Sequence, residues 1–92
     1  MKITDSAQDA VLKVMRSKQL DPHSWYFELR LLENGAIGIG FTKTILNTDS
    51  VQKFGELSFI IGQNLDTDGM LIDFTEYNGK WGLVFGGEKY PN

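Results

Sequence analysis

The sequence predicts an α+β domain: one N-terminal amphipathic helix followed by about five mostly antiparallel strands in a curled sheet or small sandwich. Three observations lead to this prediction. Apolar residues recur at helical spacing near the N-terminus, the period changes to two after residue 24, and short runs rich in Gly, Asn and Asp separate the later apolar segments. Because 92 residues suffice for one hydrophobic core only, we expect a single domain over residues 1–92.

The expected helix runs from Asp5 to about Gln19. Thr4 or Ser6 can cap its N-terminus, and Pro22 disfavours helical structure in the residue before it. The apolar residues that share one face at three- and four-residue spacing are Ala7, Ala10, Val11, Val14 and Met15.

Strands are expected where apolar residues alternate or form short continuous runs. Asn78-Gly79 is a strong signal for a two-residue hairpin turn, because both turn positions tolerate positive φ. The polar segment 47–50 is expected to be a loop. The five predicted strands lie within residues 24–32, 37–46, 56–62, 70–77 and 80–87.

Composition excludes several classes of function. The sequence has no cysteine, which excludes a disulfide scaffold, a Cys nucleophile and an iron–sulfur cluster held by its own thiolates. Nine Lys and Arg against twelve Asp and Glu give a net charge of −3 without a basic stripe, so no nucleic-acid partner is expected. No stretch has the length of a signal-peptide core or a membrane span, which predicts a cytoplasmic protein with no membrane partner.

The run "NGAIGIGF" at residues 34–41 raises the question of a phosphate-binding loop. Such a loop normally lies at a helix N-terminus, whereas "FTKTIL" follows here and is typical of a strand. Glycines within a strand instead allow a bulge, a sharp bend or a bulky neighbour packed across them. Trp25 or Trp81 are candidates for that neighbour.

Five segments occur in the order found in one known family. They are "KITDSAQDAV" (2–11), "LRLLENGAIG" (29–38), "TDSVQKFGELSFII" (48–61), "TDGMLIDFTE" (67–76) and "WGLVFGGEKYPN" (81–92). In this set the chain resembles the A-type iron–sulfur carrier family, also called HesB-like. The resemblance implies the HesB-like fold for nearly the whole chain.

The departures from the family bear on function. The family's ligands are one cysteine in the glycine-rich segment and a Cys-x-Cys pair in the tail. The first position falls on Ala36, and the pair would lie beyond Asn92. The resemblance therefore implies a HesB-like domain with no cluster ligands, no cofactor and no catalytic residues.

Other candidate chemistry is weak. Asp66, Asp68 and Asp73 with Glu76 form the densest acidic group, but their spacing does not match a calcium loop. Turn formation is the favoured interpretation of these residues, with weak cation or ligand contact as the alternative. His23 lies in "DPHSW" and is expected to be a solvated turn residue, so we do not expect an enzyme.

Two functional hypotheses remain. The leading one is a protein-interaction or regulatory module related to iron–sulfur cluster assembly, with the cluster-assembly machinery as the partner implied by resemblance. The alternative is a small-molecule or cation-binding domain that uses the glycine bend and the acidic loop Asp66–Asp73. Apolar residues on the second face of the strands at 24–32 and 56–62 also indicate a homo-oligomer or another protein partner.

Overall fold

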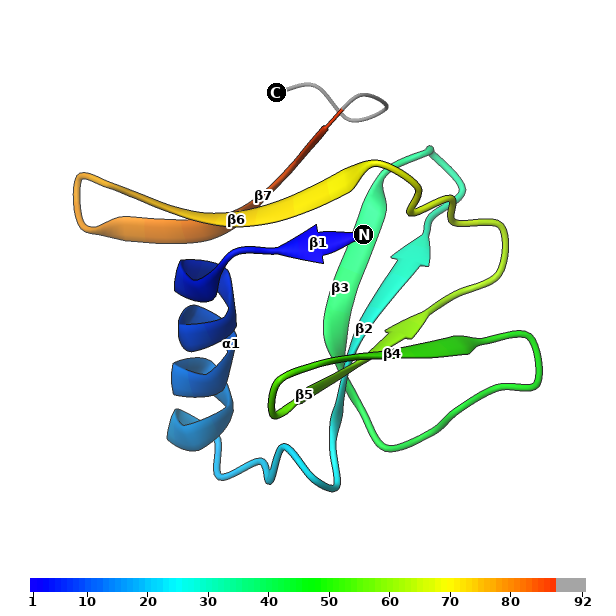
Figure 1. Cartoon of the computed structure of the whole chain (residues 1–92), viewed down its shortest axis with the longest axis horizontal. Coiled ribbons are helices and arrows are strands. Elements are labelled where there is room, and N and C mark those ends of the chain that lie inside the picture. The colour runs from blue at the N-terminus through cyan, green and yellow to red at the C-terminus, as the bar shows by residue number, and fades with distance from the viewer. Residues whose placement is uncertain (88–92) are drawn as a thin grey trace. The chain divides into compact units, whose positions relative to one another are not determined.

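The computed structural model describes residues 1–87, apart from the side chains of residues 77, 80 and 81. It confirms the α+β prediction, with one helix and seven strands that form two open sheets (Figure 1). The chain divides into two compact units. One contains residues 1–14 and the segment from 67 onward, and the other contains residues 15–66.

The first unit contains a three-stranded sheet of order β1-β6-β7, in which β1 is parallel to β6 and β6 is antiparallel to β7. The β6–β7 connection is the predicted two-residue turn, because Asn78 and Gly79 have φ of 53° and 75° and Tyr77 pairs with Lys80. The strands are β1 (Lys2–Ile3), β6 (Met70–Tyr77) and β7 (Lys80–Gly87).

The helix α1 (Asp5–Ser17) ends two residues earlier than predicted. Gln19 has a φ of 58°, and the N–H of Leu20 donates to the carbonyl oxygen of Met15 at 2.8 Å. This is the Schellman arrangement, in which a residue in the left-handed conformation closes the last turn.

The second unit contains a four-stranded sheet of order β3-β2-β5-β4. The β2–β5 pair is parallel, and the two outer pairs are antiparallel. A parallel pair requires a crossover connection, and here β3 and β4 both lie between β2 and β5 in the chain. The strands are β2 (Tyr26–Leu31), β3 (Ile37–Thr42), β4 (Ser50–Phe54) and β5 (Leu57–Ile61).

The sequence prediction missed β1 and β4 and made β3 too long. β1 has only two residues, too few for any periodicity. β4 includes Ser50, Gln52 and Lys53, and it is an edge strand whose polar composition resembles that of a loop. β3 stops at Thr42 rather than continuing to Leu46, so the alternation beyond Thr42 was misleading.

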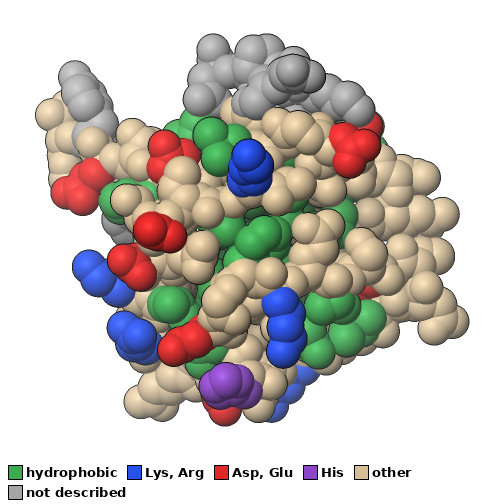
Figure 2. Space-filling view, in the orientation of Figure 1, with side chains coloured by type: hydrophobic (Ala, Val, Ile, Leu, Met, Phe, Trp, Pro, Cys, Tyr) green, Lys and Arg blue, Asp and Glu red, His purple; other side chains and the backbone are tan. Residues whose placement is uncertain are grey.

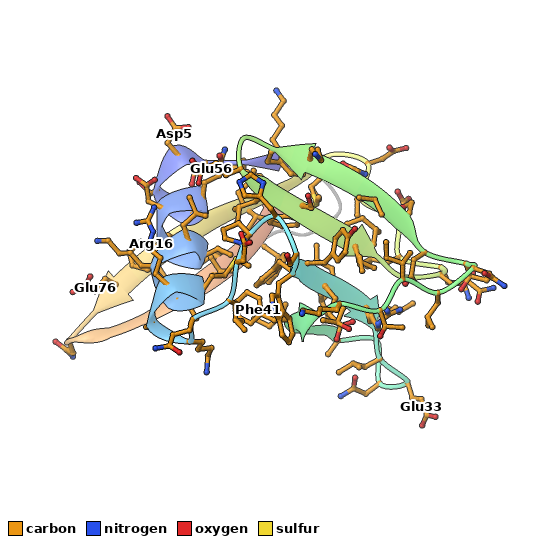
Figure 3. The ribbon with its side chains drawn as sticks, turned by 90° about the horizontal axis from the view of Figure 1, so that it is seen from below. Asp5, Arg16, Glu33, Phe41, Glu56 and Glu76 are labelled. Carbon is orange, nitrogen blue, oxygen red and sulfur yellow. The ribbon has the colours of Figure 1, made fainter. Side chains whose placement is uncertain are left out.

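A row of four phenylalanines crosses the four-stranded sheet, with one ring from each strand. Phe27 of β2 lies 5.5 Å from Phe41 of β3 and 5.0 Å from Phe59 of β5, measured between ring centroids. Phe59 in turn lies 5.3 Å from Phe54 of β4. Figure 3 labels Phe41 among these side chains. Edge-to-face and tilted rings at such distances stabilise the sheet beyond their buried area.

Each unit has buried apolar side chains of its own. In the first unit they are Ala7, Val11, Met70 and Ile72. In the second unit they are Met15, Phe27, Leu29, Leu57, Phe59, Ile60, Ile61 and Leu65. Within the described part of the chain, no helix is long and apolar enough to cross a membrane.

Candidate functional site

The hairpin between β2 and β3 is the segment that the sequence singled out by its glycines. The N–H of Leu32 donates to the carbonyl oxygen of Ala36 at 2.8 Å, and the N–H of Gly35 donates to the oxygen of Leu32 at 2.9 Å. Gly35 has a φ of 84°, which favours glycine. The side-chain oxygen of Asn34 accepts the N–H of Ala36 at 3.0 Å, and Glu33 projects from the hairpin tip (Figure 3).

This geometry is a tight turn followed by a one-residue bulge, and it orients its backbone groups toward each other rather than toward a ligand. Ala36 is exposed beside the bulge. Its methyl group has no donor atom for a metal or a cluster. The bend is therefore held by hydrogen bonds within the hairpin itself.

The glycines of β3 make room for side chains of the neighbouring strand. A Cβ added at Gly38 would lie 3.0 Å from Cδ2 of Leu32, and one at Gly40 would lie 3.3 Å from Oε1 of Glu28. These distances are at or below the lower limit of ordinary contact. The glycines of β3 therefore accommodate bulky neighbours, which is one of the alternatives that the sequence left open, but these neighbours are Leu32 and Glu28 rather than Trp25.

Trp25 makes a different contact. Nζ of Lys43 lies 5.3 Å from the centroid of a Trp25 ring, within the range of a cation–π interaction. Lys43 is exposed to solvent. The other tryptophan that the sequence offered, Trp81, has a side chain outside the described residues.

A charged cluster lies on the face of the four-stranded sheet where Glu28 packs over Gly40. Arg30 donates through Nε to Oε2 of Glu28 at 2.9 Å and through both Nη atoms to the carboxylate of Asp49 at 2.9 and 3.1 Å. The side chain of Asp49 is inaccessible to solvent and also accepts the N–H of Leu46 at 2.8 Å. A Cβ at Gly62 would lie 3.2 Å from Cγ and Nη1 of Arg30, so Gly62 provides the space for the guanidinium.

These hydrogen bonds shift the pKa values of Asp49 and Arg30 in opposite directions. The Arg30 guanidinium, and then the Leu46 N–H, hold the pKa of Asp49 below its ordinary value. Hydrogen bonds to Asp49 and then to Glu28 raise the pKa of Arg30 above its ordinary value. Two carboxylates and one guanidinium bonded to each other form a structural ion cluster. Such a cluster connects the loop that contains Asp49 to β2.

The pair of Arg30 and Asp49 was not predicted from the sequence. The two residues are 19 positions apart and lie on either side of β3 and a loop. Their opposite charges were visible in the sequence, but only the course of the chain after β3 brings them together.

The acidic candidates do not form one cluster. Asp73 lies in β6, where Oδ1 accepts the hydroxyl of Thr4 at 2.8 Å and the N–H of Phe74 at 2.8 Å. Asp68 lies in the turn between Thr67 and Met70, and Asp66 precedes that turn. Among the described residues, no group of three or more His, Asp and Glu side chains is placed to hold a metal ion.

His23, the purple side chain in Figure 2, is exposed in a turn, as the sequence predicted. The carboxylate of Asp21 accepts the backbone N–H of His23 at 2.9 Å, which closes this turn. Figure 2 also shows acidic and basic side chains interspersed on the face drawn, in keeping with the absence of a basic stripe in the sequence.

A shallow depression of about 280 Å³ lies along β6 and β7. Asp73 and Thr75 contribute its polar lining, and Leu71 and Val84 contribute apolar surface. Asp73 and Val84 are direct cross-strand partners, so the depression follows one face of the hairpin. Its polar side chains suit a small polar ligand or a cation.

Exposed apolar side chains gather in the second unit. Leu31 is 44% exposed, although Phe27 and Leu29, which alternate with it along β2, are buried. Ile60, on the opposite face, is fully buried. Among the described residues, the large apolar side chains that are exposed are Leu31, Leu32, Ile39, Ile45, Leu46 and Val51 in this unit and Leu71 in the other. Surface of this kind is suited to contact with another protein.

The helix and two open sheets define an α+β fold of the IscA type. The solved structure described as "Crystal Structure of IscA with the [2Fe-2S] cluster" is similar to this chain, with a TM-score of 0.59 over 96% of this chain and 83% of that one. The two sequences are 13% identical, so the likeness concerns the fold. No family model matches the chain, and no curated protein matches it in sequence.

Proposed function

We propose that this chain is one HesB-like domain, over residues 1–92, that acts through protein–protein contact in iron–sulfur cluster assembly without holding a cluster itself. The observation that carries the proposal is the combination of an IscA-type fold over 96% of the chain with a non-ligating Ala36 beside its hairpin bulge. The 92-residue sequence contains no cysteine. A regulator or competitor in cluster assembly needs the fold's contact surface and not its thiolates, and we expect it to act in the cytoplasm.

The polar groups of the second unit support a role in binding rather than catalysis. The carboxylate of Asp49 and the guanidinium of Arg30 are bonded to each other, and Glu28 is bonded to Arg30. The exposed apolar side chains of Leu31 and Leu32 lie beside the hairpin and offer a contact surface. Apolar contact areas of this type are usual in protein interfaces.

The test combines reconstitution with capture of partners. Purified chain treated anaerobically with iron and sulfide should give no stoichiometric visible chromophore, and tagged chain should recover cluster-assembly proteins from native lysate. Leu31→Glu should reduce that recovery. Val51→Glu is the matched control, since both side chains are 44% exposed. A stoichiometric chromophore, or a recovery free of cluster-assembly proteins, would contradict the proposal.

The second candidate function is binding of a cation or small molecule by the first unit. The observation that favours it is the depression along β6 and β7, where Asp73 and Thr75 supply oxygen atoms. Calcium, iron or an anionic metabolite should then raise the melting temperature in a saturable way, and Asp73→Asn should weaken the effect. An unchanged melting curve across this panel would remove the candidate.

A further inference from the structure

Within the described part of the second unit, β3 is an edge strand whose own residues carry no charge. It is the outermost strand of the four-stranded sheet, and residues 34–42 contain no charged residue. The opposite edge of that sheet, β4, contains Lys53, and the edge strand β1 contains Lys2. Charged residues on an edge strand disfavour pairing with another chain, and β3 has no such protection.

The register of the β2–β3 pair determines which backbone groups of β3 point outward. In an antiparallel pair, hydrogen-bonded and non-hydrogen-bonded residue pairs alternate along the strands. Since Leu32 and Ala36 form a hydrogen-bonded pair at the hairpin, the backbone groups of Gly38 and Gly40 bond to β2. The intervening positions are Ile37, Ile39 and Phe41, and their N–H and C=O groups face the free edge. An added strand would bond to these three residues.

The side chains leave this edge accessible. Ile39 is 53% exposed, although its cross-strand partner Leu29 is fully buried. On the other face Gly38 and Gly40 have no side chains, and Glu28 and Leu32 lie over them from the neighbouring strand. Because Gly38 and Gly40 carry no side chains, their positions add no bulk at the outer edge of β3, where a second strand would pair in the plane of the sheet.

From these observations we infer that β3 pairs antiparallel with β3 of a second copy of this chain, about a two-fold axis at Ile39. Ile39 then faces Ile39 of the other copy, and Ile37 faces Phe41. Pairing in this register forms about six backbone hydrogen bonds. It joins two four-stranded sheets into one sheet through a self-complementary contact.

Charge favours a second copy in this orientation. Glu33 precedes the uncharged run and Lys43 follows it. Antiparallel pairing brings Glu33 of each copy near Lys43 of the other, while parallel pairing would bring like charges together. Each copy thus supplies both the strand and the complementary charge. The inference does not depend on a role in cluster assembly.

The test measures association and register together. Sedimentation equilibrium of the native chain should give twice the mass of 10.4 kDa at high concentration. Ile39→Lys should weaken association at least tenfold while circular dichroism and the melting temperature show a folded chain. Val51→Lys, at a 44% exposed position on the opposite edge of the sheet, is the matched control and should leave association unchanged.

A second measurement reports the register. Since the sequence has no cysteine, Ile39→Cys introduces a single labelling site. Facing residues in such a pair lie about 5.5 Å apart between Cα atoms, so pyrene attached there should give excimer fluorescence. Val51→Cys labelled in the same way should give none. A native chain that stays monomeric, equal weakening by both lysine variants, or the absence of excimer at position 39 would overturn the inference. So would a monomer that instead adds an unrelated extended peptide at β3.

Discussion

The hydroxyl of Thr4 donates to Oδ1 of Asp73 at 2.8 Å across 69 residues of sequence. The same hydroxyl oxygen accepts the N–H of Ala7 at 3.1 Å and so caps the first turn of α1. The backbone N–H of Thr4 donates to the carbonyl oxygen of Ile72 at 3.0 Å. Thr4 thus caps the start of the helix, and it also connects the end of β1 to β6.

Replacing Thr4 should reveal this double role. Thr4→Ala removes the cap and the bond to Asp73, and we expect the free energy of unfolding to fall by about 1 kcal/mol or somewhat more. Thr4→Ser keeps the hydroxyl and should retain most of the stability. Urea denaturation followed by circular dichroism measures both. Equal losses for the two variants would show that the hydroxyl contributes nothing.

Stability should decrease in acid because of Asp73. The Thr4 hydroxyl, and then the Phe74 N–H, hold the pKa of Asp73 below its ordinary value near 3.8. A carboxyl whose pKa is lower in the folded state stabilises the protein fully above the unfolded-state pKa, and this contribution disappears as the pH falls through the folded-state pKa. Asp49 should act in the same direction in the other unit.

The unfolding free energy should therefore decline as the pH falls below about 4, and Asp73→Asn should make that decline shallower. Urea denaturation at several pH values from about 6 to about 2.5 provides the measurement. Asp9→Asn, at an exposed position on the helix, is a control with the same change of charge. Identical slopes for native chain and Asp73→Asn would contradict this assignment.

The space at Gly62 should be essential for the Arg30–Asp49 pair. An added Cβ would lie 3.2 Å from Arg30 and 3.3 Å from the backbone oxygen of Leu29, and the backbone cannot easily move. We expect Gly62→Ala to destabilise the chain by about 1–3 kcal/mol. Gly82→Ala meets no atom within 4 Å and should be neutral or slightly stabilising. Denaturant unfolding compares the two variants, and the prediction is wrong if they behave alike.

Gln19 adopts a backbone conformation that costs less for glycine. With its φ of 58°, Gln19→Gly should stabilise the chain by about 1 kcal/mol, because glycine has no Cβ penalty in the left-handed region. Gln8→Gly, within α1, should instead destabilise it by about 1 kcal/mol. Thermal unfolding of both variants distinguishes a conformational effect from a general effect of glycine. Destabilisation by Gln19→Gly would contradict the prediction that the left-handed conformation of Gln19 costs free energy.

Local sequence signals predicted the elements that depend on neighbouring residues. Helical spacing predicted α1, because an amphipathic face repeats within the segment itself. Asn78-Gly79 predicted the β6–β7 turn, because only residues that tolerate positive φ fit there. The strands β1 and β4 escaped prediction, since a two-residue strand and a polar edge strand acquire their structure from their partners.

The candidate site shows the same division. The absence of thiolate and of a phosphate loop is a property of the sequence, as is the methyl group of Ala36. Tertiary structure decided three other features. Leu32 and Glu28 lie over the glycines, Arg30 is bonded to Asp49, and Ile39 is exposed while Leu29 is buried. Residue chemistry can be read at each position, but burial and partnership depend on which strands become neighbours. Which strands become neighbours is determined by contacts between segments that are far apart in the sequence.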